Sequence, residues 1–362
     1  MSQVVIQGAG IAGCALASLL AREGHGVAVV ERASAPRSGG QAVDVRGAAL
    51  RVVEHMGLAD EIRARRTKLR GMSIYDESGK EIETKTERTM GRNQLDGEDI
   101  ELFRDDLAKI FLEGTENHVE FCFGDEIASL RENDAGIAVL LVSGERRMVD
   151  LVVGADGLRS GVRRLAFGPD DVHIRPLGFY VGVYSAANRI ALQDWQIACR
   201  TPERGAVIYP TRDNSELRVA LYFATREADP PAHDTTAQRR ALKAHLDGIG
   251  GPIGTMIEEL DRAEDLYADG MAQVRMDTWS RGRVALIGDA AFCPSPLTGQ
   301  GTSLALVGAY VLARELAGST GHEAALARYE KRLRPFVLAN QDIDLRTGEG
   351  IDQAKNAFEF DA

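Results

Sequence analysis

Short runs of consecutive apolar residues alternate along the chain with longer stretches of mixed polarity. The first two runs, residues 4–6 and 27–30, are short, uniformly apolar and rich in valine. This pattern is typical of strands that are buried on both faces. Between them, residues 15–22 are rich in Ala and Leu and predict a helix that ends near Gly24. Together they predict a βαβ unit, whose crossover is right-handed in nearly all known cases.

Later stretches continue this mixture of buried strands and helices. Residues 151–153 and 283–287 predict two more strands buried on both faces, and a glycine follows each of them. Residues 100–112 predict a helix, and residues 119–130 and 136–142 predict strands. Strands and helices that alternate in this way are typical of a parallel sheet covered by helices.

Two central regions alternate more loosely between apolar and polar residues, as half-buried antiparallel strands do. Residues 73–86 predict a β-hairpin, and residues 173–225 predict an antiparallel sheet with aromatic side chains on one face. Towards the carboxyl terminus, residues 302–317 and 323–338 predict helices, and a partly ordered tail follows.

The turn after the first strand carries a specific glycine pattern. A strand precedes Gly8-x-Gly10-x-x-Gly13, a helix follows it, and Glu31 lies 18 residues beyond the last glycine. This context predicts a dinucleotide-binding turn, because Gly8 permits the tight turn, Gly10 lets the backbone approach a pyrophosphate, and Gly13 lets helix pack on strand. The helix amino terminus favours phosphate. Glu31 can accept hydrogen bonds from ribose hydroxyls. We also place Ala12, which precedes Gly13, and Arg32, which follows Glu31, at this cofactor site.

Composition narrows the function classes. The 362 residues carry 54 acidic and 43 basic side chains, a net charge of −11, which disfavours nucleic-acid binding. The four cysteines and seven histidines lack metal-ligand spacing, so we expect no metal site and no disulfide scaffold. We also expect no targeting peptide and no membrane span. These features favour a cytoplasmic protein, monomeric or homodimeric, with a small-molecule partner.

Two further motifs follow in a fixed order: Gly154-Ala155-Asp156-Gly157, and then Gly288-Asp289-Ala290-Ala291 with Gly299-Gln300-Gly301. With the first glycine turn, they make the chain resemble the class A (single-component) flavoprotein monooxygenases, the aromatic-hydroxylase family. Within that family it is most similar in appearance to the tetracycline-inactivating monooxygenases. The resemblance spans essentially the whole chain, and its motifs are specific for the fold and for FAD but much less so for the substrate.

The resemblance implies a fold and a domain organisation. The expected α/β fold has a Rossmann-like FAD-binding domain, an inserted antiparallel-sheet substrate domain and C-terminal helices. The FAD-binding domain takes residues 1–72, 100–172 and 271–320, the substrate domain takes 73–99 and 173–270, and the C-terminal helical segment takes 321–362.

The resemblance also implies roles for particular residues. Glu31 holds the adenosine ribose of FAD, Arg104 contacts FAD, and Asp289 binds the ribityl hydroxyls. Asp156 and Gly157 belong to an element that handles both FAD and NAD(P)H. Backbone near the isoalloxazine ring is supplied by Pro296, Gly299, Gln300 and Gly301. Arg46 is a candidate contact of the nicotinamide or flavin, and a solvent-facing structural arginine is an equal alternative.

Two positions depart from the family pattern. Phe292 stands where many relatives carry histidine, and Thr302-Ser303 replaces a family asparagine. Backbone atoms make most of the expected contacts with FAD, so both changes leave its binding intact. They put in doubt the polar tuning that those side chains give in relatives.

The implied reaction is a monooxygenation. NADPH or NADH reduces FAD, O₂ forms a flavin C4a-hydroperoxide, and one oxygen passes to an aromatic or polyketide-like substrate, tetracyclines included. The cofactor carries this chemistry, so we name no catalytic residue. An FAD-dependent reductase of a prenyl or other unsaturated substrate is an alternative, and a non-catalytic binding scaffold is another. Halogenation is disfavoured because Trp195 and Trp279 are too far apart for a Trp-x-Trp motif.

The substrate site is expected on the predicted antiparallel sheet. Four polar or aromatic side chains there are candidates for its lining: Tyr184, Tyr209, Arg212 and Tyr222. The alternative for each of them is packing in the core or on the outer surface of the sheet.

Overall fold

A computed structural model describes residues 2–37, 39–86, 89–90, 93–94, 98–115, 118–226, 234–319, 321–344, 347 and 349–360. Its first sheet has six strands in the order β19-β20-β13-β1-β2-β9, and all but the edge strand β19 are parallel. The strands are β1 (Gln3–Gln7), β2 (Gly26–Glu31), β9 (Val119–Phe123), β13 (Leu151–Gly154), β19 (Ser280–Arg281) and β20 (Val284–Leu286). The predicted βαβ unit is confirmed, since β1 pairs in parallel with β2 across α1 (Ile11–Arg22).

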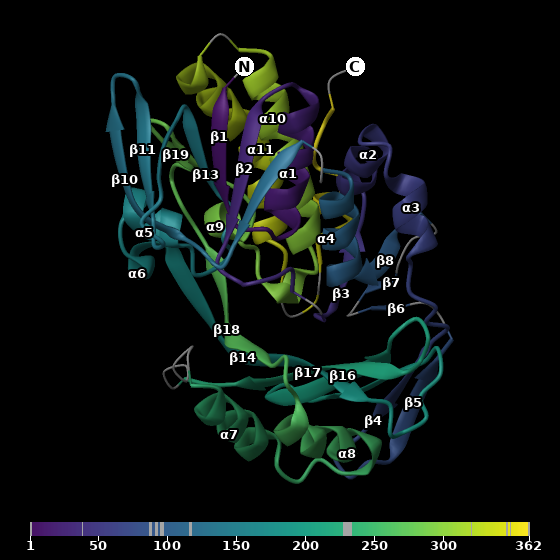
Figure 1. The fold of residues 1–362 in the computed structure, drawn as a ribbon. Helices are drawn as coiled ribbons and strands as arrows, with labels where there is room; N and C mark the ends of the chain where they lie inside the picture. Colours follow the sequence, from purple (N-terminus) through teal and green to yellow (C-terminus); the bar gives the residue numbers. More distant parts are fainter. Residues whose placement is uncertain are drawn as a thin grey trace.

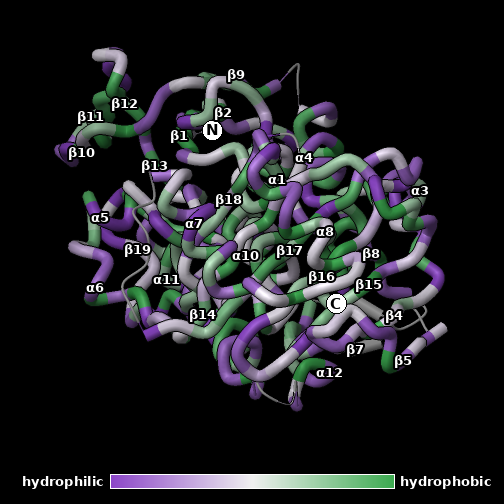
Figure 2. The backbone as a smooth tube through the Cα atoms, turned by 90° about the horizontal axis from the view of Figure 1, so that it is seen from below, coloured by the Kyte–Doolittle hydropathy of each residue, from purple (hydrophilic) through white to green (hydrophobic). Residues whose placement is uncertain are grey.

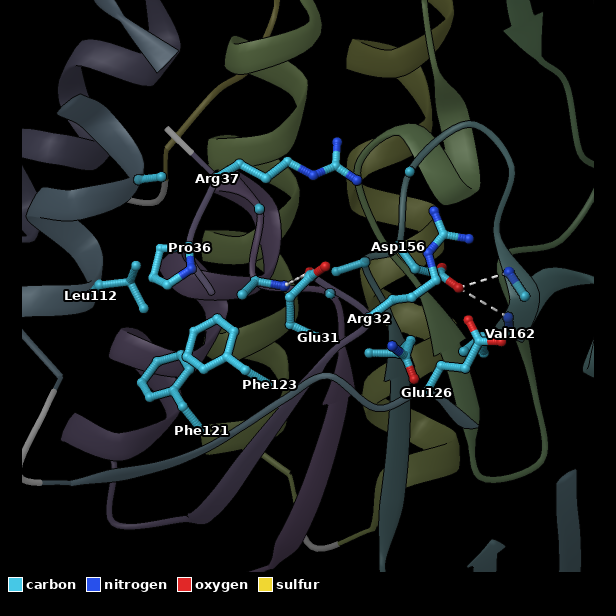
Figure 3. Close-up of a pocket in the computed structure, with 18 of the residues that line it drawn as sticks. Glu31, Arg32, Pro36, Arg37, Leu112, Phe121, Phe123, Glu126, Asp156 and Val162 are labelled. Carbon is cyan, nitrogen blue, oxygen red and sulfur yellow. Dashed lines mark hydrogen bonds between the residues drawn. The ribbon is translucent and has the colours of Figure 1, made fainter. Parts of the chain in front are cut away.

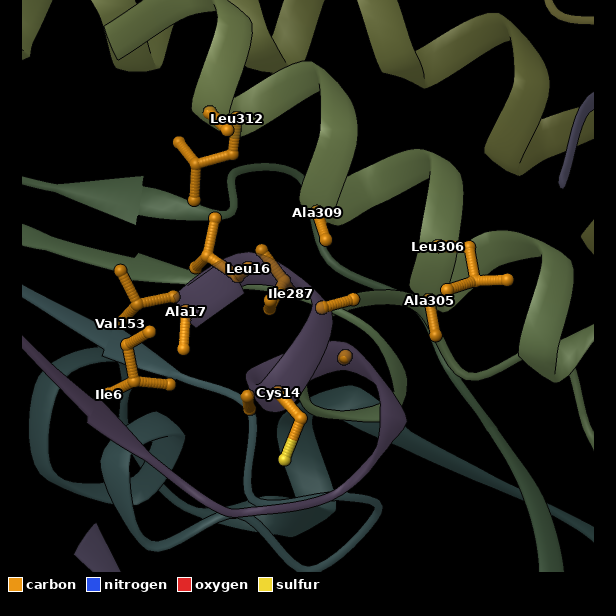
Figure 4. Close-up of a cluster of buried hydrophobic side chains, with 14 of the residues drawn as sticks. Ile6, Cys14, Leu16, Ala17, Val153, Ile287, Ala305, Leu306, Ala309 and Leu312 are labelled. Carbon is orange, nitrogen blue, oxygen red and sulfur yellow. The ribbon is translucent and has the colours of Figure 1, made fainter. Parts of the chain in front are cut away.

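The main core lies between this sheet and two helices. Figure 4 shows α1 and α10 (Gly301–Ala317) packed together with small side chains at their contact, including Ala17, Ala305 and Ala309. Small residues let the two helices approach closely, while Ile6 and Val153 on the sheet fill the space beneath. Helix α10 is therefore buried along most of its length, and its amino terminus is held at the carboxyl edge of the sheet.

The second sheet has seven strands in the order β18-β14-β17-β16-β15-β4-β5. Figure 1 shows it below the first domain, with α7 (Thr235–Leu246) and α8 (Gly251–Glu259) beneath it. A short 3-10 turn (Leu260–Arg262) follows α8. The strands are β4 (Met72–Tyr75), β5 (Glu81–Lys85), β14 (Ile174–Ala187), β15 (Gln196–Arg200), β16 (Arg204–Pro210), β17 (Glu216–Ala224) and β18 (Tyr267–Val274). In this sheet β4 and β15 pair in parallel, and the other described neighbours pair antiparallel. The Rossmann-like domain and the mainly antiparallel second domain thus match the predicted fold class.

Two predicted domain boundaries fall inside strands of the second sheet. The boundary at 72/73 cuts β4, and the boundary at 270/271 cuts β18, which pairs with β14 from Ile174 to Val183. Both boundaries are therefore wrong by a few residues. Gly270 interrupts the alternation of β18, so the sequence carried little strand signal there.

Two predicted elements are also corrected. Ile100–Phe103 is a strand, β8, that pairs with β3 (Ala42–Val45), and the helix α4 covers only Arg104–Glu113. The stretch 119–130 is two strands, because Gly124 has a φ of +78° and ends β9. The second of them, β10 (Ile127–Asn133), joins β11 (Gly136–Leu141) and β12 (Arg146–Val149) in a separate sheet.

The remaining helices lie around the first sheet. They are α2 (Ala48–His55), α3 (Ala59–Ala64), α5 (Gly161–Phe167), α6 (Asp170–His173), α9 (Asp289–Phe292), a 3-10 turn (Pro296–Thr298), α11 (His322–Gln341) and α12 (Ile351–Ala354). Two short strands complete the set, β6 (Thr89–Met90) and β7 (Asn93–Gln94). Beyond α12 the chain has no regular structure as far as residue 360, yet Phe358 is buried against Phe336. The described end of the expected tail is therefore packed rather than frayed.

Hydropathy follows this architecture. Figure 2 shows hydrophobic stretches gathered in the middle of the molecule and hydrophilic ones at its rim, with the β10–β12 sheet projecting at one corner, as it also does in Figure 1. Among the described helices, none has the length and apolar character that crossing a bilayer requires.

Candidate cofactor and substrate site

A cavity of about 940 Å³ opens at the carboxyl ends of β1, β2 and β13. This is the edge at which open parallel sheets bind ligands. Figure 3 shows part of its lining, with Glu31 in the middle. The cavity brings together seven of the predicted cofactor residues: Gly8, Gly10, Glu31, Arg32, Arg104, Asp156 and Gly157.

Two glycines of the first turn serve different needs. A side-chain carbon at Gly13 would lie 1.9 Å from the backbone oxygen of Gly8. Only glycine therefore fits there, because of packing within the protein and not because of a ligand. A carbon at Gly10 would meet Arg104 Nη2 at 3.8 Å and nothing nearer, and the backbone of Gly10 (φ −82°, ψ −175°) suits any residue. Gly10 therefore leaves bare backbone facing the cavity, as close approach of a phosphate requires.

Glu31 closes the loop around this turn. Its carboxylate accepts hydrogen bonds from the backbone N–H groups of Ala9 and Ala33, each at 2.8 Å. One oxygen serves each donor, so both retain lone pairs towards the cavity. The side chain thus fixes the position of the glycine turn and also offers acceptors at the end of β2.

Asp156 caps a helix at the cavity wall. Its carboxylate accepts from the Ser160 hydroxyl at 2.5 Å and from the backbone N–H groups of Gly161 and Val162 at 2.7 and 3.1 Å. Burial raises the pKa of this carboxyl group, and these hydrogen bonds oppose the shift. With both oxygens engaged inside the protein, Asp156 shapes the turn that carries Gly157 at the cavity wall.

Arg104 supplies a positive charge beside the glycine turn. It is the first residue of α4, and its side chain lies along Gly40 and reaches the space over Gly10. Burial lowers the pKa of its guanidinium, and the nearby charge of Arg37 adds to this, but an arginine remains charged at neutral pH. A cation here complements a pyrophosphate bound at the amino terminus of α1.

Asp289 and Ala12 connect the last motif to the first. Ala12 is buried against Gly288, where a side-chain carbon would lie 2.9 Å from the Ala12 methyl group. Ala12 is therefore a packing residue of the cofactor turn. Asp289 follows at the start of α9, and its side chain is exposed. Desolvation by the surrounding protein nevertheless raises the pKa of its carboxyl group, and a hydrogen bond with Cys293 and the charge of Arg104 oppose the shift.

The segment before α10 is a bare, tightly turned loop. Pro296–Thr298 forms a 3-10 turn, and Gly299 adopts a left-handed conformation with φ of +66°. Within the described part of the chain, the amide of Gln300 and the hydroxyl of Ser303 are buried and have no hydrogen-bond partner. Buried polar groups are normally satisfied. These groups, the exposed Asp289 and the backbone before α10 therefore fit a flavin with its polar ring edge and hydroxylated chain.

Arg46 is buried, so the solvent-facing alternative for this residue is wrong. Its guanidinium lies 2.8 Å from the carboxylate of Asp44 and 3.8 Å from that of Asp99. Lys355, from the carboxyl-terminal segment, also pairs with Asp99 at 3.4 Å, and its backbone oxygen accepts from Ala48. Asp44 in turn lies beside Gly299. The buried network of Arg46, Asp44, Asp99 and Lys355 thus packs against the loop before α10 through Asp44.

Arg163 is a structural residue that the sequence reasoning missed. Its side chain is fully buried and donates to the backbone oxygens of Leu158 and Ala290 at 2.6 and 2.9 Å, and to Asp170 at 2.5 Å. It therefore ties the loop after β13 to the start of α9. Leu158 and Asp170 are near in sequence, but Ala290, the partner that links the two loops, is 127 residues away, so the sequence offered only an arginine shortly after the Asp156-Gly157 motif.

The second sheet presents two different faces. Tyr184 pairs with Val219, and its hydroxyl donates to the backbone oxygen of Met256 at 2.5 Å, inside the core between the sheet and α8. The prediction that Tyr184 lines the substrate site is therefore wrong. It faces the helices, whereas Tyr222, paired with Val181, lies on the opposite face and is half-buried.

Tyr209 and Arg212 lie where the two domains meet. The Tyr209 ring stacks on Phe103 at 6.2 Å, and its hydroxyl accepts from the backbone N–H of Ala42 at 2.8 Å. Arg212 donates to the backbone oxygen of Ala64 at 3.1 Å. Both side chains hold the second sheet against the first domain, beside the face that carries Tyr222.

Comparison with known proteins supports a flavoprotein. Residues 1–343 match the model of the FAD binding domain family. An uncharacterised protein of Mycobacterium tuberculosis is 41% identical over 342 residues, which cover 94% of this chain and 92% of that protein. A flavin-dependent monooxygenase of Legionella longbeachae is 32% identical over 350 residues, which cover 96% of this chain and 89% of that enzyme.

Two solved structures of tetracycline destructases have the same overall fold as this chain. The crystal structure of the tetracycline destructase Tet(55) superposes with a TM-score of 0.90 and 32% identity, covering 99% of this chain and 98% of that one. Tet(51), another tetracycline destructase, gives a TM-score of 0.89 and 29% identity over the full length of both chains.

Proposed function

The chain belongs to the class A FAD-dependent monooxygenases, and from this premise we propose that it uses NADPH or NADH and O₂ to hydroxylate an aromatic or polyketide-like small molecule. The observation that supports this most directly is the cavity at the carboxyl edge of the parallel sheet, with Gly10, Glu31 and Arg104 around it. Tetracyclines are one substrate class within the proposal, given the likeness to tetracycline destructases.

The residues divide between the two ends of FAD. Gly10 and the amino terminus of α1 take the pyrophosphate, Arg104 neutralises it, and Glu31 accepts from the adenosine ribose. Asp289 accepts from the ribityl hydroxyls, and the backbone from Pro296 to Gly301 contacts the ring. When bound and reduced, FAD supplies the activation of O₂ at its C4a carbon.

The protein contributes an electrostatic setting for the ring. Helix α10 has 17 residues and begins at Gly301, so its positive dipole end points at the proposed ring site. Reduced flavin is anionic at its pyrimidine edge, and a helix amino terminus stabilises that charge. The buried Gln300 amide and Ser303 hydroxyl, which lack partners among the described residues, can donate hydrogen bonds to the same edge.

The substrate is proposed to bind between the ring and the second sheet. Tyr222 is half-buried on the sheet face that looks towards the first domain, and Tyr209 and Arg212 fix the sheet at one side. Aromatic side chains on such a face suit a flat, partly apolar substrate. Phe292 cannot supply the polar tuning that a histidine gives in relatives, because its side chain is apolar. Its ring is buried, with its centroid 4.9 Å from that of the Trp279 ring.

The test is turnover with labelled oxygen. Purified FAD-loaded protein is mixed with NADPH or NADH and a panel of phenols, polyketides and tetracyclines under ¹⁸O₂. We expect substrate-stimulated oxidation of the nicotinamide and a product that carries one labelled oxygen atom. Nicotinamide oxidation with a reduced, label-free product would instead support the alternative, an FAD-dependent reductase of an unsaturated or prenyl substrate. No oxidation with any compound would overturn the proposal.

A further inference from the structure

Two phenylalanines form a flat surface inside the cavity. Phe121 and Phe123 alternate on β9, so both side chains lie on the same face of this edge strand. Their ring centroids are 6.0 Å apart and the ring planes differ by 15°. Both rings are half-buried and line the cavity together with Pro36 and Leu112. We call Phe121 and Phe123 the aromatic shelf.

The aromatic shelf and the Asp156 loop lie on opposite sides of Glu31. Figure 3 shows Phe121 and Phe123 beside Pro36 on one side of Glu31, with Asp156 and Val162 on the other. The contacts assigned to FAD use the glycine turn, Glu31 and the Asp156 loop. None of them involves the aromatic shelf, so the cavity offers a flat surface, not used by those contacts, next to the acid assigned to the FAD ribose.

The chemistry of the shelf favours a nucleobase that carries phosphate. Aromatic rings bind bases by stacking, whatever the base, because every base has a π face. Arg37 and Lys109 line the same cavity and supply positive charge for a phosphate. Lys109 pairs with Glu113 at 3.6 Å, but both side chains are exposed, and such pairs are weak and easily exchanged.

The shared chemical build of FAD and NAD(P)H points to the ligand. FAD and NAD(P)H each consist of an adenosine diphosphate joined to a redox ring, and the two rings must meet for hydride transfer. If both molecules run in the same direction, their adenine ends fall at the same end of the cavity. We infer that the aromatic shelf binds the adenine of NAD(P)H beside the adenosine of FAD. The inference rests on the proposed function for its choice of reductant.

The experiment uses the FAD-loaded protein and ADP, an adenine nucleotide that lacks the nicotinamide. Calorimetric titration measures ADP affinity in the wild type and in the double variant Phe121→Leu/Phe123→Leu, which keeps apolar side chains and removes the rings. We expect ADP affinity to fall about tenfold or more, given the usual strength of base stacking. The KM for NAD(P)H should rise by a similar factor, while FAD content and the kcat at saturating NAD(P)H stay unchanged.

Phe360→Leu is the matched control, because Phe360 is also half-buried but packs on Tyr310 and Phe358 outside the cavity. It should leave ADP affinity and the KM unchanged. If the double variant folds poorly, the single variants Phe121→Leu and Phe123→Leu are titrated in its place, and each should weaken ADP binding.

Two outcomes would overturn the inference. Unchanged ADP affinity in the variants would show that no base stacks on the shelf, and loss of FAD from them would assign the shelf to the adenine of FAD itself. Failure of the proposed function has a different signature, because the wild type would then oxidise no NAD(P)H or form a product without labelled oxygen, whatever the result of the ADP titration.

Discussion

The two large sheets use their surfaces in opposite ways. The central strands of the six-stranded sheet are buried on both faces, so β1 and β13 have no side chains left for a ligand along their length. The residues that we assign to FAD on that sheet lie at the strand ends, as Glu31 does in β2, or in the loops beyond them, and of its described strands the edge strand β9 alone adds side chains along its length to the cavity. The seven-stranded sheet buries one face under α7 and α8 and turns the other towards the first domain. Its candidate contacts are therefore every second residue along a strand.

This difference decides what a substitution can do. In the parallel sheet, neighbours within one turn divide between packing and ligand contact, as Gly13 and Gly10 do. In the antiparallel sheet, the division follows the pleat, so Tyr184 and Tyr222 belong to different faces although both lie in the same sheet. Paired substitutions in each sheet can therefore separate loss of stability from loss of binding.

The largest expected effect is at Gly13. Gly13→Ala puts a methyl group 1.9 Å from the Gly8 oxygen, so the backbone must shift, and we expect a loss of about 4 kcal/mol or more in the free energy of unfolding. Gly10→Ala meets no protein atom closer than 3.8 Å and should cost less than about 1 kcal/mol. Denaturant unfolding of the FAD-free proteins measures both.

Gly10→Ala should nevertheless weaken FAD binding about tenfold or more, because the methyl group occupies the side from which the pyrophosphate approaches. Fluorescence titration with FAD measures this. Unchanged FAD affinity in a well-folded Gly10→Ala protein would contradict the placement of the pyrophosphate.

The next effect tests how the strand-end loops are held together. Arg163→Met removes a buried cation that bonds to the loop after β13 and to Ala290. The backbone oxygens of Leu158 and Ala290 lose this donor, and Asp170 keeps only Arg164 among the described residues, so we expect a loss of about 3 kcal/mol in stability. Arg164→Met is the control, because Arg164 is exposed although it also pairs with Asp170. A cost at Arg163 no greater than at Arg164 would show that the loops hold their positions independently.

A smaller pair of effects tests the two faces of the antiparallel sheet. Tyr184→Phe leaves the buried oxygen of Met256 without its donor and should cost about 1 kcal/mol in stability, with the substrate KM unchanged. Tyr222→Phe should cost less in stability and raise the substrate KM. Thermal unfolding and steady-state kinetics with the substrate found in the oxygenation screen distinguish them. Equal effects of the two variants on the substrate KM would contradict the assignment of Tyr222 to the substrate-facing side of the sheet and of Tyr184 to the core side.

The accuracy of the sequence-based predictions follows the same division. The βαβ unit was predictable because its strand, turn, helix and acid are consecutive in the chain. The face of Tyr184 was not, because it depends on pairing with β17, set by contacts between distant segments. Ile100–Phe103 has apolar residues at spacings that also suit a helix. It forms a strand because it pairs with β3, which is distant in the sequence. The role of Arg163 depends on Ala290, which is 127 residues away, so its own neighbourhood carries no signal of the link between the two loops.

The smallest expected effect concerns Asp289, which lies at the strand-end edge but is exposed. The pKa of its carboxyl group is raised in the folded protein, so the native state binds the proton more tightly than the unfolded chain does. The stabilising contribution is complete below the unfolded value of about 3.9 and is lost as the pH rises through the higher folded value. In the FAD-free protein at neutral pH, the charged Asp289 therefore lowers stability.

Asp289→Asn should accordingly raise the Tm of the FAD-free protein slightly at about pH 7, and the gain should vanish at about pH 3, where the aspartate is protonated in both states. The same variant should bind FAD more weakly, because the ribityl hydroxyls lose a charged acceptor. Tm measured across this pH range, together with FAD titration, checks both signs. A variant that is less stable at neutral pH and binds FAD as tightly as the wild type would make Asp289 a structural residue. Packing and ligand contact in the loops of the parallel sheet would then not be divided between neighbouring residues in the way that Gly13 and Gly10 suggest.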